Sequence, residues 1–300
     1  MPELPEVESM RRGIAAVSGA RILSAQFPME GCRPLSITPS PSILARQLTG
    51  AMLGGIERFG KRVAIGITSQ QLPEPRWLLI EPRMTGLLLV ADPPSTKHVR
   101  MQLELGLCSI PRLLFWDQRG LGTIRLLDAA GLERACGPAK LGPDGLVINA
   151  PDLQLRLGGS RRAVKVALLD QRAVAGIGNI YASEILHRAG IHPQTPCQDL
   201  RTEAWQGIAT AARRVLAAAV RLEGSSIGDE LYRTADNRKG GYQRFHRVYG
   251  LHGSQCRCGA EIRRIVQAQR STFFCPSCQP SRSPRRISSR GRLESRDKKA

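Results

Sequence analysis

Apolar residues recur every three or four positions near the beginning of the chain, at Val7, Met10, Ile14 and Val17. This spacing places them on one side of an α-helix, while the polar and basic residues between them face away from that side. Gly19 ends the pattern, as glycine commonly does after a helix. The sequence therefore predicts one amphipathic helix at the start of the chain.

Short runs rich in apolar and β-branched residues follow, separated by glycine, proline and aspartate. The predicted strands are 62–68, 77–81, 87–91, 99–105, 113–117 and 123–127. Short strands with frequent turn residues favour an antiparallel β-sandwich over a parallel sheet with crossover helices. We therefore expect residues 1–145 to form one helix packed on a β-sandwich, in a protein of the α+β class.

The β pattern ends around residues 141–144, and helical periods begin at Ser160. Ser160 is expected to cap a helix that carries Val164, and a second helix is expected to pass through Tyr181 and Ile185. A third, alanine-rich helix is predicted over 202–222. Its buried stripe is expected to consist of Trp205, Ile208, Ala212, Val215 and Ala219.

A glycine turn, Gly176-Ile-Gly178-Asn179, lies between the first two of these helices. It is not a dinucleotide-binding fingerprint, because Tyr181 stands where the third glycine would be and no strand precedes it. Backbone N–H groups at a helix start suit a phosphate. A phosphate site and a simple turn between helices both remain open. Farther on, residues 224–241 are polar, basic and long enough for a lid-like loop.

Charge is the strongest signal in the overall composition. The 300 residues contain 44 Lys and Arg against 25 Asp and Glu, a net charge of +19. Such a chain is expected to bind a polyanion, and nucleic acid is favoured over a membrane surface because no long basic amphipathic helix occurs. No apolar run approaches the ~18 residues of a membrane span, and no signal-peptide pattern is present. We therefore expect a cytoplasmic location.

Cysteine spacing predicts a metal site. Four of the eight cysteines are scattered and are expected to fill cores, namely Cys32, Cys108, Cys136 and Cys197. The other four form two close pairs near the end of the chain, Cys256, Cys258, Cys275 and Cys278. Two such pairs indicate one structural zinc ion on a β-hairpin, although the first pair has only one residue between its cysteines. After this unit, residues 280–300 form a basic stretch that is expected to be a disordered tail.

The first residues of the chain carry a candidate reaction centre. Removal of Met1 would leave Pro2 as a terminal secondary amine, and Glu3 and Glu6 follow it on one face of the predicted helix. A terminal amine titrates near ~8, against ~10.4 for lysine, so more of it is neutral and nucleophilic at pH 7. Two carboxylates beside it could transfer protons. The alternative is structural, since proline and glutamate are common in a first helical turn.

Three motifs in this order carry a family resemblance: PELPEVE at 2–8, GIGNIYASE at 176–184 and QRSTFFCPSCQ at 269–279. With them, the chain resembles bacterial formamidopyrimidine-DNA glycosylase, within the wider group that includes endonuclease VIII, from residue 2 to about 279. The resemblance implies a monomeric enzyme that excises oxidised purines from double-stranded DNA and then cleaves the abasic strand by β,δ-elimination. It also implies a β-sandwich joined to a helix-two-turn-helix domain and a zinc finger.

The same resemblance assigns roles to individual residues. Pro2 matches the nucleophile that forms an iminium with the sugar, Glu3 the acid that helps to open the sugar, and Glu6 a supporting carboxylate. Lys61 matches an essential basic residue near the lesion. The residues implied to contact DNA are His98, Arg119, Lys165, Asn179 and Arg270.

Three side chains are implied to fill the gap that a flipped-out base leaves, and these are Met84, Arg119 and Leu121. The chain departs from the family pattern here, because EPRM at 81–84 stands in place of His-Leu-Gly-Met and Leu121 in place of phenylalanine. Leucine stacks less than phenylalanine, which leaves the preference for the opposite base open. The short Cys256/Cys258 spacing is a further departure.

Two alternative functions remain. An endonuclease VIII-like enzyme would act on oxidised pyrimidines, but Leu4 stands where that branch usually has glycine. A DNA-damage-binding protein without catalysis is the other, against which Pro2, Glu3 and Lys61 argue. The expected division is 1–145 for the catalytic unit, 146–253 for the helix-two-turn-helix unit with its lid loop, 254–279 for the zinc hairpin and 280–300 for the tail. A cytoplasmic DNA-repair enzyme would associate with the nucleoid.

Overall fold

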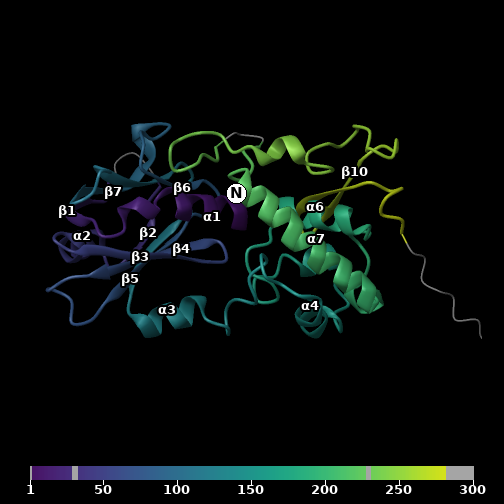
Figure 1. Cartoon of the computed structure of the whole chain (residues 1–300), viewed down its shortest axis with the longest axis horizontal. Coiled ribbons are helices and arrows are strands. Elements are labelled where there is room, and N and C mark those ends of the chain that lie inside the picture. Colours follow the sequence, from purple (N-terminus) through teal and green to yellow (C-terminus); the bar gives the residue numbers. More distant parts are fainter. Residues whose placement is uncertain (1, 29–32, 228–230, 282–300) are drawn as a thin grey trace, which may run out of the picture.

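The computed structural model describes residues 2–28, 33–227 and 231–281, which form a strand-rich lobe and a helical lobe (Figure 1). Helix α1, Leu4–Gly13, begins where the two lobes meet. It is followed by a 3₁₀ turn, Ala15–Val17. Val7 and Val17 are fully buried, as are the apolar residues between them at helical spacing, so the predicted first helix is confirmed, with a tighter last turn.

Nine strands form one sheet in the described part of the first lobe. They are β1 (Arg21–Gln26), β2 (Ser36–Thr38), β3 (Met52–Phe59), β4 (Arg62–Thr68), β5 (Arg76–Glu81), β6 (Gly86–Leu89), β7 (Val99–Gly106), β8 (Arg112–Asp117) and β9 (Thr123–Leu127). Their order is β2-β9-β5-β4-β3-β1-β7-β8-β6, antiparallel except for the parallel pair β2–β9. All six predicted strands are present, whereas β1, β2 and most of β3 were not predicted.

The two halves of this sheet meet at β1. That strand pairs with β3 at a single position, Arg21↔Met52, and with β7 at five positions with a bulge. One core contains residues from both halves, such as Ile80 of β5 and Leu87 of β6. The expected sandwich is therefore a single sheet that folds around a common core. Two short helices, α2 (Pro41–Leu48) and α3 (Ala129–Cys136), were not predicted.

The second lobe contains helices α4 (Ala150–Leu157), α5 (Val164–Ala167), α6 (Asn179–Ala189) and α7 (Thr202–Arg221). The predicted stripe of α7 is buried, as is Tyr181 of α6. The prediction for Ser160 is wrong: α5 has only four residues and follows Ala163, and the Ser160 hydroxyl accepts a hydrogen bond from the Arg162 N–H at 3.2 Å. Ser160 therefore forms a local turn instead of a helix cap. No helix in the described ranges has the length and apolar character needed to cross a membrane.

A two-stranded hairpin, β10 (Arg263–Gln267) and β11 (Arg270–Phe274), packs against the helical lobe. Its two-residue turn has positive φ at both Ala268 and Gln269, as a type I′ turn requires. The loop after α6 holds the hairpin in place: the Gln279 side chain donates to the Ile191 carbonyl at 2.8 Å, and the His192 ring lies 4.8 Å from that of Phe274. The predicted tail lies outside the described residues, apart from residues 280 and 281.

In the stretch that was predicted as a lid, the described residues pack closely against the first lobe. Tyr232 and Ala235 are buried and belong to its core, and the Val90 N–H donates to the Ala235 carbonyl at 2.9 Å. Residues 228–230 of that stretch lie outside the described ranges.

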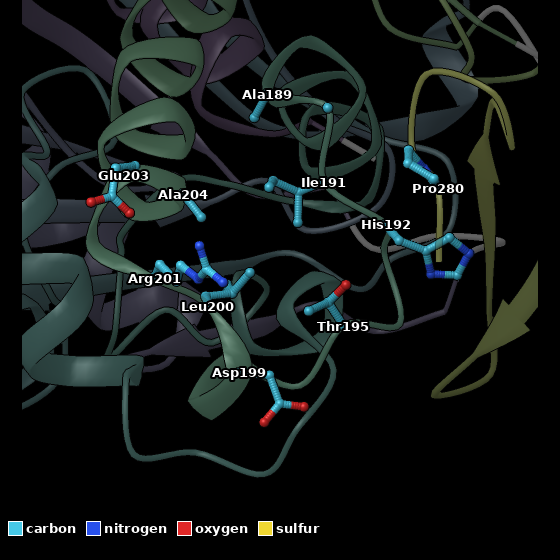
Figure 2. A pocket seen from close by; sticks show the side chains of 11 residues that line it. Ala189, Ile191, His192, Thr195, Asp199, Leu200, Arg201, Glu203, Ala204 and Pro280 are labelled. Carbon is cyan, nitrogen blue, oxygen red and sulfur yellow. The ribbon is translucent and has the colours of Figure 1, made fainter. Parts of the chain in front are cut away.

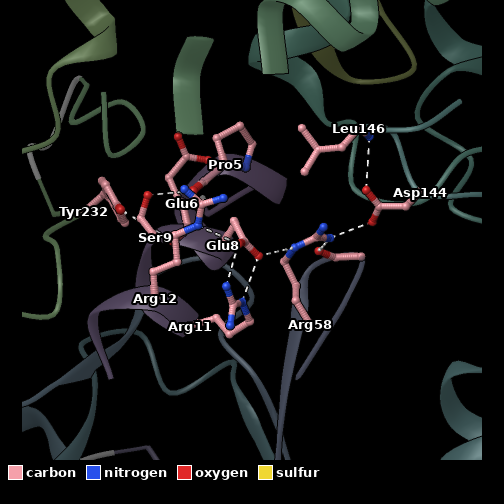
Figure 3. Close-up of polar contacts among 11 residues, drawn as sticks. Pro5, Glu6, Glu8, Ser9, Arg11, Arg12, Arg58, Asp144, Leu146 and Tyr232 are labelled. Carbon is pink, nitrogen blue, oxygen red and sulfur yellow. Dashed lines mark hydrogen bonds and ion pairs between the residues drawn. The ribbon is translucent and has the colours of Figure 1, made fainter. Parts of the chain in front are cut away.

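An ion-pair network joins α1, the β3–β4 hairpin and the segment that enters the second lobe (Figure 3). Glu8 accepts from Arg11, Arg12 and Arg58 at 2.9, 2.7 and 3.0 Å, and Arg58 also donates to Asp144 at 2.7 Å. Burial alone would raise the pKa of Glu8, but the arginines outweigh it and hold this pKa at about 2. Arg58 further donates to the Gly60 carbonyl at 3.0 Å, beside the predicted functional Lys61.

We expect Arg58→Met to lower the free energy of unfolding by about 2–3 kcal/mol, because it removes the nearly buried partner that Glu8 and Asp144 share. The matched control is Arg12→Met, since the Arg12 side chain is 56% exposed on the same carboxylate. That variant should lose less than about 1 kcal/mol. Chemical denaturation measures both, and equal losses would contradict a special role for Arg58.

The pKa of Glu8 also predicts how stability depends on pH. A carboxyl group with a lowered pKa in the folded protein stabilises it fully above the ordinary value of 4.5, and this stabilisation is lost as the pH falls towards 2. The native protein should therefore lose stability more steeply between pH 5 and pH 2 than Glu8→Gln, by at most about 1.4 kcal/mol per pH unit. Parallel profiles from denaturation at a series of pH values would show this inference to be wrong.

Candidate active site

The predicted reaction centre lies where the start of α1 meets the start of α6. The Leu4 N–H donates to the Gly176 carbonyl at 3.0 Å. Glu3 is buried, and its carboxylate accepts from the Ile180 N–H at 2.9 Å and the Tyr181 N–H at 3.3 Å. The first backbone donors of α6, which have no partner within the helix, thus hold the side chain of Glu3.

The glycine turn allows this close approach. A Cβ atom on Gly178 would lie 2.3 Å from Cδ of Glu3, and one on Gly176, whose φ is +96°, would lie 2.4 Å from Leu4. Larger residues would push α1 and α6 apart. Two N–H groups at the start of the helix, those of Ile180 and Tyr181, thus bind a carboxylate of the same chain. The interpretation of the turn as a phosphate site stays a prediction for its other residues.

Glu6 holds the backbone of Glu3. Its Oε2 accepts from the Glu3 N–H at 2.8 Å, and its Oε1 accepts from the Tyr181 hydroxyl at 2.6 Å and the Ser225 N–H at 2.8 Å. Burial, followed by the charge of Glu3, raises the pKa of Glu6. Glu3 and Glu6 thus have the structural role in the first helical turn that the sequence left open. Glu3 also directly follows Pro2, and Glu6 binds the Glu3 backbone.

Pro2 lines a small cavity between the lobes together with Met84, Ser225 and Tyr232. Lys61 interacts electrostatically with Glu3, Glu6 and Arg270. Burial lowers the pKa of its amine, the carboxylates of Glu3 and Glu6 oppose this, and the Arg270 guanidinium adds to it. The structure therefore brings Pro2 into one region with two carboxylates and a lysine that interact electrostatically.

Two basic residues and an asparagine, from three different elements, adjoin this region. Lys165 donates to the Asn179 side chain at 2.5 Å, and Asn179 in turn donates to the Ser271 carbonyl of β11 at 3.0 Å. Burial, followed by the charge of Arg270, lowers the pKa of Lys165 to about 8. Arg270 is exposed at the start of β11. The structure thus brings Lys165, Asn179 and Arg270 together, as their predicted common role requires.

The remaining predicted residues belong to the strand-rich lobe. Met84 precedes β6, and Arg119 and Leu121 follow β8, which pairs with β6. His98 packs edge-on against Trp116 of β8 at 5.6 Å, and burial, followed by Arg100 and Lys97, lowers its pKa. Of these residues, Met84 lines the cavity beside Pro2.

Sequence reasoning missed several residues of the site. Tyr181 was interpreted only as helix core, yet its hydroxyl donates to Glu6. The Ser225 hydroxyl lies 3.3 Å from the Tyr181 hydroxyl and 3.0 Å from Nε2 of His246, and so links the two side chains. Tyr181 and Glu6 are 175 positions apart, so no local pattern connects them. The Gly-x-Gly turn was the one available signal, because it marks a helix start that something must approach closely.

The four predicted metal ligands form a cluster. The Sγ atoms of Cys256, Cys258, Cys275 and Cys278 all lie within 4.8 Å of one another. Four thiolates at this separation fit one tetrahedral zinc ion, so the short spacing of the first pair does not prevent the cluster from forming. The His187 Nε2 atom lies 3.6 Å from the Cys256 sulfur and connects the cluster to α6.

A separate surface pocket lies between the end of α6 and the start of α7 (Figure 2). Its lining includes Ile191, His192, Leu200, Arg201 and Glu203, and none of the predicted site residues. The candidate active site is thus distinct from this pocket.

Three family models match successive parts of the chain. The formamidopyrimidine-DNA glycosylase N-terminal domain matches residues 1–124, the H2TH domain of formamidopyrimidine-DNA glycosylase matches 141–230, and a zinc finger found in FPG and IleRS matches 257–280.

Relatives and solved structures agree with these matches. The formamidopyrimidine-DNA glycosylase of Chloroflexus aggregans is 39% identical over 93% of this chain and 98% of its own length. That of Thermomicrobium roseum is 38% identical over 93% and 99%. The Lactococcus lactis Fpg in complex with DNA containing an abasic site superimposes with a TM-score of 0.81, at 31% identity, over 93% of this chain and 100% of that one.

We expect Cys275→Ala to lose the zinc ion, because three thiolates leave the tetrahedral site incomplete. Metal analysis of the purified protein should find one zinc per chain in the native protein and much less in the variant. Cys197→Ala is the matched control, since Cys197 is buried in the helical lobe outside the cluster and should leave the metal in place. Full retention of zinc by Cys275→Ala would overturn the assignment.

Proposed function

This chain belongs to the formamidopyrimidine-DNA glycosylase family, and from this premise we propose that it excises oxidised purines from duplex DNA and cleaves the abasic strand. Its substrates are 8-oxoguanine and formamidopyrimidines, and its pathway is base-excision repair. The observation that carries the proposal is the placement of Pro2 between the lobes, beside the Glu3 carboxylate that the start of α6 fixes.

The first step uses the terminal amine of Pro2 after removal of Met1. The nitrogen lone pair attacks C1′ of the deoxyribose, and the bond between C1′ and the damaged base breaks, with its electron pair leaving on the base. The departing base takes up a proton, and the attached Pro2 nitrogen loses its own proton and regains a lone pair. Glu3 transfers a proton to the ring oxygen O4′, which opens the sugar. The product is an iminium between Pro2 and C1′. An iminium formed from a secondary amine has no N–H bond. It therefore cannot lose a proton from nitrogen and stays cationic.

The iminium makes strand cleavage possible. It accepts electrons when a proton leaves C2′, and the 3′ phosphate departs in the β-elimination. A second elimination releases the 5′ phosphate, and water then frees the amine. Glu6 supports these steps indirectly, because its hydrogen bond to the Glu3 N–H fixes the backbone that carries both Pro2 and Glu3.

The basic and polar residues around Pro2 and Glu3 bind DNA. Lys61, Lys165, Asn179 and Arg270 contact phosphates beside the lesion, with His98 and Arg119 on the other lobe. The net charge of +19 supports a large electrostatic contribution to affinity. The enzyme acts as a monomer on chromosomal DNA, in the cytoplasm with the nucleoid. The division at residues 145, 253 and 279 stays a prediction.

One observation favours a broader substrate range. A solved structure of the Lactococcus lactis Fpg, with 31% identity and a TM-score of 0.79, is a complex with DNA containing an oxidised pyrimidine. We therefore retain excision of oxidised pyrimidines as a second candidate activity. Trapping on thymine glycol that is faster than on 8-oxoguanine would make it the principal one.

Borohydride trapping tests the nucleophile. Reduction converts an iminium into a stable amine, so the native protein should form a covalent complex with a duplex that contains 8-oxoguanine opposite cytosine. A residue retained ahead of Pro2 turns its amine into an amide and should abolish the complex. Denaturing electrophoresis measures the product, and mass spectrometry confirms that the native chain starts at Pro2.

Two further variants separate the roles. Glu3→Gln should slow base excision by about 10²–10⁴-fold while lesion binding stays close to native, because the amide keeps the shape but transfers no proton. Glu74→Gln, on a 53% exposed side chain, is the matched control and should keep native rates. If the native protein binds the lesion duplex yet traps nothing, the assignment of Pro2 must be abandoned.

A further inference from the structure

The two loops that carry Met84, Arg119 and Leu121 leave the same end of one strand pair. Strands β6 and β8 are antiparallel, and their register places Gly86 opposite Asp117. Residues 82–85 therefore enter this end, and residues 118–122 leave it. Met84 lies in the first loop, and Arg119 and Leu121 lie in the second.

A single buried carboxylate connects the two loops. Asp117 is fully buried, and its Oδ1 accepts a hydrogen bond from the Thr85 hydroxyl, while its Oδ2 accepts from the Gly122 N–H at 2.8 Å. The Thr85 hydroxyl oxygen in turn accepts from the Arg119 N–H at 3.0 Å. Buried Arg100 donates to the Asp117 carbonyl at 2.9 Å and supplies a positive charge nearby.

Apart from the bond from Arg100, each of these bonds ends at, or next to, a predicted gap-filling residue. Thr85 follows Met84, Gly122 follows Leu121, and the third bond is made by Arg119 itself. A buried carboxylate without hydrogen-bond partners has a large free-energy cost, so movement of the loops that breaks these bonds is unfavourable. Asp117 thus ties the backbone at all three positions to the rigid end of the sheet.

Close packing of the same loops is an independent sign that their conformation is fixed. A Cβ atom on Gly86 would lie 2.5 Å from the Pro82 carbonyl oxygen, and one on Gly122 would lie 2.8 Å from the ring of Phe115. Gly120 has a φ of +59°, and a Cβ there would lie 2.9 Å from the Arg33 carbonyl oxygen. A side chain at any of these three positions would clash with the loop's present surroundings.

We propose that Asp117, acting through Thr85, is a positioning residue that holds Met84, Arg119 and Leu121 as one preformed unit and thereby sets the preference for the base opposite the lesion. The proposal rests on the proposed function. The three side chains must enter the duplex together when the damaged base leaves the stack, and their fixed placement decides how Arg119 meets the orphaned base. Preformed placement removes the cost of ordering two loops during that step.

The test replaces the Thr85 hydroxyl by a methyl group of equal size, in Thr85→Val. This change leaves the Asp117 carboxylate and the Arg119 N–H each without one partner. Single-turnover excision of 8-oxoguanine opposite cytosine should slow by about 10–100-fold, and the ratio of rates opposite cytosine and opposite adenine should move towards one. Borohydride trapping on a single-stranded oligonucleotide with an abasic site should stay within about twofold of native, because no opposite base is present there.

Two control variants and one variant of Asp117 make the result decisive. Thr85→Ser keeps the hydroxyl and should restore both rate and ratio, and Asp117→Asn, which loses one of the two acceptors, should repeat the defect. Thr49→Val removes an exposed threonine hydroxyl, which donates to Ala45 at 2.9 Å, and should change nothing. If Thr85→Val does not fold, Asp117→Asn carries the same comparison.

The positioning role is overturned if Thr85→Val keeps the native ratio, or if its single-strand trapping falls as much as its excision. The second result would make Thr85 a general support of the fold. Failure of the proposed function is distinguishable, because the native protein itself would then trap no abasic oligonucleotide.

Discussion

The structure depends on one interaction, in which the N-terminal N–H groups of α6 hold the carboxylate of Glu3. A buried charge needs strong partners, and a helix start offers both unpaired donors and a favourable dipole. The distance is possible because residue 178 is glycine. This contact joins the first helix of one lobe to a helix of the other, so the residue before Glu3 lies between them. The position of Pro2 is a consequence of that constraint.

Helix α6 extends the same organisation to the zinc hairpin. Its first residue, Asn179, bonds to Lys165 on one side and to the β11 backbone on the other. Later in the helix, the buried Glu184 carboxylate accepts three backbone N–H groups, from Arg247, Val248 and Tyr249 in the segment that leads to the hairpin. A single short helix thus fixes the Glu3 carboxylate, Lys165 and the cysteine-bearing hairpin relative to one another.

The periodicity of apolar residues and the spacing of cysteines were sufficient to predict those parts of the structure that depend on residues nearby in the sequence. The six predicted strands, the long helix α7 and the cysteine cluster are of this kind. Strand β3 was largely missed because Gly54 and Gly55 interrupt its pattern, and they are tolerated where β3 packs closely on Gly66. Ser160 was misassigned because its cap depends on a helix that tertiary packing cuts to four residues. The site itself joins residues 175 or more positions apart, which no local pattern encodes.

Glu3 and Asp117 solve the same physical problem at the two sides of the proposed DNA site. Each is a buried carboxylate that accepts hydrogen bonds from segments that must stay together. Glu3 directly follows Pro2 in the chain, and the partners of Asp117 directly follow Met84 and Leu121. Separation of either set would leave a charge without partners, at a cost of about 1–3 kcal/mol or more per lost bond. Both sites are therefore organised before DNA arrives. Electrostatic groups that are already in place need no reorganisation during the reaction, and this is where such a site gains most of its rate.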